Sequence, residues 1–268
     1  MKKKILVLCL VVALAVTAVV GGTLAYFTDT DEATNTFTAG GVKIDLIEQE
    51  RDGKGGLQDF SQNQVLMPIV GSAQGEKDGQ GQPVAKNYVD KMVTIQNTGK
   101  SGAYVRAYFA IPSALDDGYE TFNAGLNVLH FNFGNVKTDN GFVSTEGNQW
   151  KWTHGNKWNY FETTIGGVAY NVYYADYYQV LPADATTEQF VSGVYLDKSF
   201  DCKDGKYYAF GEEVDMTGLI NADGEVAINC PVYAVAVQAD GFGSADEAVT
   251  AAFGAQFNPF GGTATNWQ

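Results

Sequence analysis

The sequence predicts an all-β fold, a β-sandwich followed by one short C-terminal helix. Short segments in which apolar and polar residues alternate recur at roughly 10–15-residue intervals, and turn-forming Gly, Asn and Asp separate them. The composition favours strands, because the chain contains 15 Tyr, 16 Phe and 4 Trp together with abundant Thr and Val. A single good helix signal lies near the C-terminus. Many short strands of this kind are typical of a two-sheet sandwich.

Residues 1–25 have the features of a secretion signal. Lys2–Lys4 precede an apolar run of about 16 residues, which is shorter than the ~20 residues that span a bilayer. Thr23 and Ala25 place small residues at the −3 and −1 positions of a cut between Ala25 and Tyr26. We therefore expect export and cleavage at this bond, with an uncleaved membrane anchor as the alternative.

The exported chain is strongly acidic. Loss of the three leader lysines from 17 basic residues leaves 14, against 31 Asp and Glu, a formal net charge of −17. Such a charge disfavours nucleic acid and anionic membrane surfaces. We therefore expect no nucleic-acid partner, and contact with a membrane only during export.

A polar segment, residues 26–41, separates the leader from the first predicted strand. It opens with Tyr26, Phe27 and Thr28, continues through a stretch rich in Thr and Asp, and reaches Phe37. About 14 extended residues span roughly 45–50 Å, so this arm is long enough to cross to a neighbouring molecule. The alternatives are a frayed terminus and an ordinary first edge strand.

Residues 42–240 carry the alternating segments of the predicted sandwich. The first strand, Val42–Leu46, places Val42, Ile44 and Leu46 on its buried face. Later strands are expected at 65–70, 126–133, 167–178, 190–200 and 226–238, with hairpin loops around 207–210. The segment 226–238 is the longest apolar run of the exported chain; Pro231 indicates a bulge or an edge position at its start, and we expect the part after it, residues 232–237, to be buried on both faces.

The strongest hairpin signal lies at residues 88–111. A strand at 88–96 leads into a turn at 97–102 that contains Asn and Gly, and a second strand returns at 103–111. Arg106 lies on one face of the returning strand, between two tyrosines, where we expect a stacked or paired structural role. The opposite, core-facing side of that strand carries Val105, Ala107, Phe109 and Ile111.

The segment 149–162 predicts an aromatic hairpin with a loop at 154–156. In that register Trp152 pairs with Trp158 and Trp150 with Tyr160, all on one face. The four rings are candidates for a surface on which sugars stack. The alternative, which we favour, is a core or sheet-covering patch.

Residues 241–268 contain the helix and the tail. Ser244 and Glu247 match a capping box, and helix-forming residues follow over 248–253. The exported chain also keeps two cysteines, Cys202 and Cys230. An even pair outside the cell indicates a disulfide, with two buried free thiols as the alternative.

No motif in the sequence points to catalysis. His130 and His154 are the only histidines, they fall on different predicted strands, and no zinc, phosphate-loop or nucleophile-elbow motif accompanies them. We therefore expect no enzymatic activity, no metal site and no cofactor.

Four stretches of the sequence form a recognisable set of motifs: Gly21–Asp29 (GGTLAYFTD) at the leader junction, Val93–Gly99 (VTIQNTG), Ala103–Arg106 (AYVR) and the turn at Val180–Thr187. They resemble the motifs of the TasA/camelysin family of exported biofilm-matrix proteins. The resemblance implies export through a SipW-type signal peptidase and a jelly-roll-like sandwich. It also implies polymerisation in which the freed N-terminal strand fills a groove of the next subunit. The metalloprotease activity attached to the name camelysin is not carried over, because the ligand set is missing.

The sequence thus predicts a secreted structural subunit of a biofilm-matrix fibre, on the surface or in the matrix of a Gram-positive bacterium. Its expected partners are copies of itself, with other matrix proteins or glycans as further candidates. The alternative is a cell-surface binding or adhesin module that binds glycans through the aromatic hairpin. A secreted hydrolase is the third hypothesis, and it has weak support.

Overall fold

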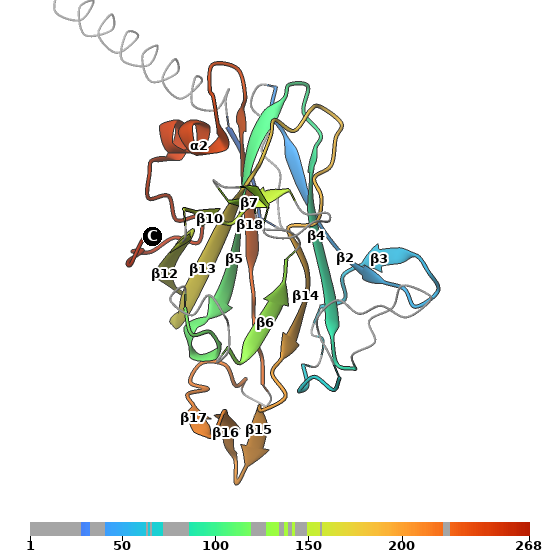
Figure 1. The fold of residues 1–268 in the computed structure, drawn as a ribbon, viewed down its shortest axis with the longest axis vertical. Helices are drawn as coiled ribbons and strands as arrows, with labels where there is room; N and C mark the ends of the chain where they lie inside the picture. The colour runs from blue at the N-terminus through green and yellow to red at the C-terminus, as the bar shows by residue number, and fades with distance from the viewer. Residues whose placement is uncertain are drawn as a thin grey trace, which may run out of the picture.

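The structure, a computed structural model, describes most of the predicted sandwich. The described residues are 28–32, 41–62, 64, 66–71, 86–118, 127–133, 137–138, 141–142, 149–155, 157–221 and 226–268. Antiparallel sheets make up most of this part, and its one α-helix lies near the C-terminus (Figure 1). The predicted all-β sandwich with a short C-terminal helix is confirmed.

The first sheet contains both β1 and β18, the first and the last described strands of the chain. Its strand order is β1-β18-β5-β13-β12, all antiparallel, and β9 pairs with the end of β13. In that order the bounds are Thr28–Glu32, Val232–Gln238, Ala103–Pro112, Val168–Tyr177 and Tyr160–Ile165, with β9 at Trp150–Lys151.

The second sheet has the order β3-β2-β4-β14-β6. The bounds in that order are Leu57–Asp59, Ile44–Arg51, Val89–Asn97, Val191–Leu196 and Leu129–Asn132. Smaller elements lie around the two sheets: η1 (Ser113–Leu115), β7 (Lys137–Thr138), β8 (Gly141–Phe142), β10 (Thr153–His154), β11 (Lys157–Trp158), β15 (Asp201–Lys203), β16 (Lys206–Ala209), β17 (Glu212–Val214) and α2 (Ala245–Phe253).

The main hydrophobic core forms from the inward faces of the two sheets. The alternation read from the sequence is confirmed here, because Val105, Ala107, Phe109 and Ile111 of β5 are all fully buried in this core. Val42 and Ile44 are fully buried as well, and Leu46 packs against the same cluster. Burial of these apolar side chains supplies the main driving force for closing the sandwich.

A second hydrophobic cluster covers the other face of the first sheet. There α2 and the tail after it pack Val249, Phe257 and Trp267 onto sheet residues that include Tyr108 and Phe161. Trp267 stacks on Phe161 with ring centroids 4.1 Å apart. The tail also extends the sheet, because Thr265 and Glu162 exchange two backbone hydrogen bonds of 2.9 Å.

Arg106 connects α2, which lies over the first sheet, to a strand of that sheet. Its guanidinium donates to both carboxylate oxygens of Asp176, at 2.6 and 2.9 Å, and to Oδ1 of Asp246 in α2 at 2.8 Å. It also lies 4.8 Å from the ring centre of Tyr174. Burial by itself would lower the pKa of Arg106, but the charge and hydrogen bonds of Asp176, together with the contributions of Tyr108 and Asp246, raise it well above its ordinary value. The paired structural role expected for Arg106 is confirmed.

The helix begins where the capping box places it. Ser244 has an extended backbone, and its hydroxyl accepts a 3.1 Å hydrogen bond from the amide of Glu247. The carboxylate of Glu247 accepts a 2.8 Å bond from the amide of Gly243, one residue before the position of the usual reciprocal contact.

Two sequence predictions are wrong in detail. No strand forms at 65–70 within the described residues, where Pro68 and Val70 make only isolated bridges. In the aromatic hairpin, Trp158 pairs with Thr153 instead of Trp152. Trp150 instead pairs with Tyr177 of β13, because a long neighbouring strand offers more backbone partners than a two-residue ladder.

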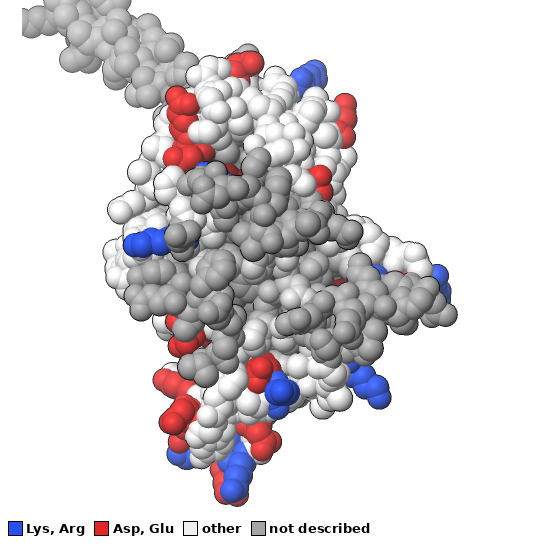
Figure 2. All heavy atoms as spheres, in the orientation of Figure 1, with Lys and Arg blue, Asp and Glu red and all other residues white. Residues whose placement is uncertain are grey.

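A three-stranded sheet of β15, β16 and β17 projects from one end of the sandwich (Figure 1). Lys206 and Glu213 form an exposed ion pair of 2.7 Å across two of its strands. Figure 2 shows basic and acidic side chains mixed at this projecting end, while acidic groups predominate along the upper left outline of the same face.

We expect Trp152→Ala to destabilise the fold strongly. Trp152 is fully buried and stacks on Phe190 at 4.4 Å, so its loss should cost about 3–5 kcal/mol of unfolding free energy. Urea unfolding measures this cost. Trp267→Ala, at a partly exposed ring, is the control and should cost less; equal losses would contradict the assignment of Trp152 to the main core.

Candidate functional site

The strand β1 forms the edge of the first sheet. It pairs antiparallel with β18 over its five residues, from Thr28 opposite Val237 to Glu32 opposite Tyr233. It also contacts β2 of the second sheet. β1 therefore lies at the seam where the two sheets of the sandwich meet, and this is the site that we consider for assembly.

β18 is buried on both faces beneath this edge. Ala234 and Ala236 face the main core, whereas Val235 and Val237 face the second cluster, and all four are at most 1% exposed. The prediction that this segment is buried on both faces is confirmed. Without β1, the remaining edge of β18 would present unpaired backbone groups, which favours pairing with another strand.

The root of the arm, residues 41–43, is hydrogen-bonded to the turn at 97–102. The amides of residues 98 and 99 donate to the carbonyl of Lys43 at 2.8 and 3.0 Å, and those of residues 100 and 101 donate to the carbonyl of Gly41 at 2.7 and 3.0 Å. Val42, between these two residues, is fully buried. The turn at 97–102 thus holds the point where the arm leaves the sandwich.

Asn97 and Gly99 make this contact specific. The fully buried side chain of Asn97 donates to the carbonyls of Ser101 and Leu181, at 2.9 and 3.0 Å, and accepts from the amide of Gly99 at 3.0 Å. A Cβ at Gly99 would lie 2.6 Å from the amide nitrogen of Lys43 and would also overlap the carbonyl of Gly41. Only glycine allows the root to approach this closely.

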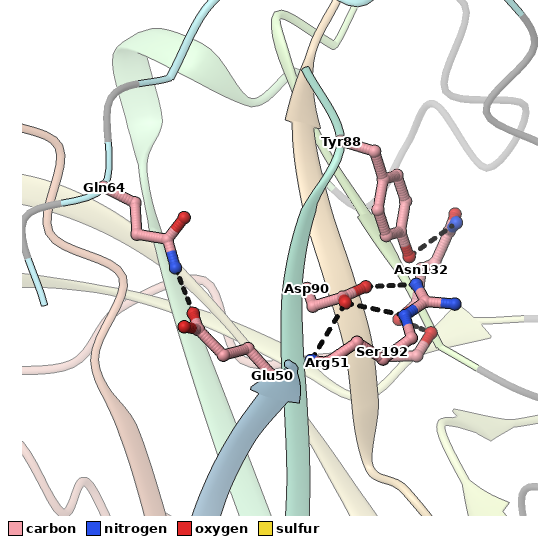
Figure 3. Close-up of polar contacts among 7 residues, drawn as sticks. All are labelled: Glu50, Arg51, Gln64, Tyr88, Asp90, Asn132 and Ser192. Carbon is pink, nitrogen blue, oxygen red and sulfur yellow. Dashed lines mark hydrogen bonds and ion pairs between the residues drawn. The ribbon is translucent and has the colours of Figure 1, made fainter. Parts of the chain in front are cut away.

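A polar cluster around Glu50 holds β3 and the residues after it against the far end of β2. The buried carboxylate of Glu50 accepts hydrogen bonds from Gln58 and from the hydroxyl of Ser61, both at 2.7 Å, and from Gln64 (Figure 3). The bonds from Ser61 and Gln58 lower the pKa of Glu50 below its ordinary value of 4.5.

Several predicted residues of the cleavage site and of the arm lie outside the described residues. These are Ala25, Tyr26, Phe27 and Phe37. Thr28 is the first residue of β1. Of the arm, the described part is thus the edge strand Thr28–Glu32 and the residue Gly41.

The structure places the aromatic hairpin in the core. Trp150 and Trp152 are fully buried, Trp158 is 7% exposed and Tyr160 is 2% exposed. The indole nitrogen of Trp150 donates to the carbonyl of Glu188 at 3.1 Å, which anchors the ring inside. These four rings expose no surface on which a sugar could stack, so the core alternative holds for them.

Cys202 and Cys230 are both free in the structure. Cys202 is exposed in β15, and Cys230 lies partly buried just before β18. Burial raises the pKa of the Cys230 thiol to about 12, which makes it a poor nucleophile.

The two histidines lie on different elements. His130 is in β6 with its Nε2 atom 3.6 Å from Asp197, and His154 is exposed at the end of β10. Within the described residues, no three His, Cys, Asp or Glu side chains come together as a metal site. No helix in that same part of the chain is long and apolar enough to cross a membrane.

Sequence reasoning missed the link between the arm root and the 97–102 turn. The pattern Asn97-Thr98-Gly99 predicted a turn, but nothing in it indicated a contact with residues 41–43. The signal was the glycine at 99, a residue that often marks close backbone approach.

The comparisons with known proteins agree with the N-terminal motifs. A family described as camelysin metallo-endopeptidase matches residues 1–50, the stretch that runs from the leader through all but the last residue of β2. The match supports the resemblance to the TasA/camelysin family over this part of the chain. No curated protein and no solved structure matches the chain.

We expect Gly99→Ala to loosen the arm root. The added methyl group collides with backbone atoms that cannot move without breaking the four hydrogen bonds to the root, so we expect a loss of about 2 kcal/mol or more. Urea unfolding and hydrogen exchange at residues 41–43 measure the effect. The control is Gly243→Ala, where the nearest atom is a flexible Glu247 oxygen at 3.4 Å.

We expect Glu50 to make stability depend on pH. Because its folded pKa lies below its unfolded value, its contribution is complete above about pH 4.5 and is lost as the pH falls through the folded pKa. In Glu50→Gln, unfolding free energy should fall less steeply between pH 5 and pH 3 than in the parent chain. The exposed Glu212→Gln serves as control, and an unchanged slope in Glu50→Gln would contradict this role.

Proposed function

We propose that this chain is a secreted subunit of an extracellular matrix fibre, assembled when each N-terminal arm pairs with β18 of a neighbouring copy. The observation that carries the proposal is the contrast between the two parts of the arm. The root, 41–43, is bonded to the 97–102 turn, whereas β1 is an edge strand that pairs with β18 alone.

Exchange of the arm between copies keeps the backbone hydrogen bonds between β1 and β18. A β1 strand from another copy can form the same five-residue backbone pairing with β18 in the same register. The bonds that stabilise the monomer then also stabilise the polymer, as in domain swapping and strand addition. The remaining cost is the entropy of association, which each joint incurs once and which a high concentration of subunits lowers.

The chain between β1 and the root is long enough for exchange. Within one molecule it must run from the level of Tyr233, opposite Glu32, back to Gln238, beside Gly41. That is a distance of about 17 Å along β18. Residues 33–40 reach roughly 26–29 Å when extended, so the arm can leave its own sheet while the root stays fixed.

The same proposal includes export and a structural role without catalysis. The leader at 1–25 delivers the chain to the outside, and cleavage before Tyr26 frees the arm. The matching family carries the name metallo-endopeptidase, but His130 and His154 of this chain lie on separate elements. A structural role accounts for the edge strand directly, which a proteolytic role does not.

A cross-link between facing residues tests where the arm binds. Glu32 and Tyr233 are paired across β1 and β18, so cysteines at both positions are placed to form a disulfide. The changes Glu32→Cys and Tyr233→Cys are made in mature protein that also carries Cys202→Ser and Cys230→Ala. Oxidised fibres should give a ladder of covalent multimers on a non-reducing gel. Single-cysteine variants, treated in the same way, are the matched controls and should give no ladder.

Deletion of residues 26–39 completes the test. The truncated chain should remain folded by circular dichroism and should form no filaments by electron microscopy, because it has no arm to donate. The proposal is wrong if filaments persist in the truncated chain. It is also wrong if fibres of the double-cysteine variant cross-link only within single chains.

A further inference from the structure

The outer face of the second sheet carries a row of three rings outside the assembly site. Tyr88, just before β4, lies beside Tyr195 of β14, with ring centroids 6.1 Å apart and an angle of 26° between the planes. Tyr195 in turn stacks on His130 of β6 at 4.8 Å and 4°. We call these residues the Tyr88 row. All three side chains are half-buried, unlike the enclosed rings of the aromatic hairpin.

The row faces away from the core. Its direct neighbours along the strands, Val89, Val194 and Leu129, are buried in the main core, and side chains alternate between the two faces of a sheet. The row therefore runs across three adjacent strands on the solvent side of the sandwich. Single exposed aromatics are common on protein surfaces, but an ordered row across three strands is not.

A glycine makes room for the first ring. The hydroxyl end of Tyr88 lies so close to Gly193 of β14 that a Cβ there would overlap it. Opposite the bulge at Gly193, the ring thus rests directly on the backbone of β14. A residue with a side chain at this position would push the ring off the sheet.

Polar groups surround the ring on the same face (Figure 3). Asn132 donates to the hydroxyl of Tyr88 at 3.2 Å, and Ser192 donates to the carbonyl of Asn132 at 3.0 Å. Beside them the guanidinium of Arg51 binds Asp90, with Nε 2.7 Å from Oδ2. An amide, two hydroxyls, a guanidinium and a carboxylate thus lie beside the stacked rings of the row.

The groups of this region carry no excess of positive charge, since the carboxylate of Asp197 also lies 3.6 Å from the Nε2 atom of His130. Arg51 pairs with Asp90, and burial lowers the pKa of His130, so the imidazole is neutral at pH 7. The chain as a whole carries a net charge of −14. The surface therefore offers no excess of positive charge to an anionic polymer, and a neutral ligand fits it better.

We propose that the Tyr88 row binds a neutral carbohydrate chain. The apolar C–H face of a sugar ring packs against aromatic rings, and its hydroxyl groups both donate and accept hydrogen bonds. The row and its polar neighbours match both properties. In a fibre each copy would present one such site, so that weak single contacts would add up along the polymer.

Affinity electrophoresis of the mature chain tests this site. Native gels contain hydroxyethylcellulose, dextran or soluble starch as neutral polysaccharides, or polygalacturonate as the anionic comparison. Tyr88→Leu and Tyr195→Leu remove the rings but keep apolar volume, so that the sheet still folds. Tyr178→Leu, at a ring that is 38% exposed and outside the row, is the matched control. Circular dichroism and size-exclusion chromatography confirm that all variants have the parent's fold and assembly state.

We expect at least one neutral polysaccharide to retard the parent chain, with no retardation by polygalacturonate. Tyr88→Leu and Tyr195→Leu should each weaken the retardation by about tenfold in apparent affinity, while Tyr178→Leu leaves it unchanged. Migration of the parent chain unaffected by all three neutral polysaccharides would overturn the proposal. Equal retardation of the parent and the two row variants would also overturn it, as would stronger binding to polygalacturonate.

If a row variant loses its fold, saturation-transfer NMR on the parent chain with cellohexaose decides the question. Irradiation of the tyrosine ring protons should then reduce the signals of the sugar ring protons, and the absence of such transfer would count against the site.

Discussion

The backbone pairing of β18 on both of its edges is the constraint on which the rest of the structure depends. β5 binds one edge and β1 the other, while the two faces of β18 enter separate hydrophobic clusters. A strand that is buried in this way cannot leave an edge open without cost, because its amides and carbonyls need partners. β1 of the same chain provides these partners in the structure. In the proposed fibre, β1 of another copy provides them instead.

The clusters on either side of β18 have different origins. The main core arises between the two sheets, as in any sandwich, and the aromatic hairpin contributes its largest rings. The second cluster depends on the C-terminal segment, which covers a face that would otherwise expose Tyr108, Phe161 and Val235. Arg106 connects the first sheet to the C-terminal segment, because it donates hydrogen bonds to Asp176 in β13 and to Asp246 in α2.

Much of the fold could be predicted, because the alternation of apolar and polar residues along a strand indicates which of its faces is buried. Residues 89–97 show this plainly, because buried and partly exposed positions alternate along β4. The helix after Ser244 could be predicted in a different way, from its capping box. The register of the aromatic hairpin could not be predicted, since β13 competed for Trp150. The contact of Gly99 with the arm root and the Tyr88 row both join residues far apart in the chain. Neither leaves a local pattern beyond a glycine where a side chain would be expected.

The anchored root has a mechanical consequence for a fibre built from such subunits. Tension along the polymer would enter each subunit through its incoming arm on β18 and leave through residues 41–43. The exit point lies beside the turn that joins β4 and β5, one strand from each sheet. A pull would thus be shared between both layers of the sandwich at once. Such a joint resists stretching better than one in which the load peels a single strand away.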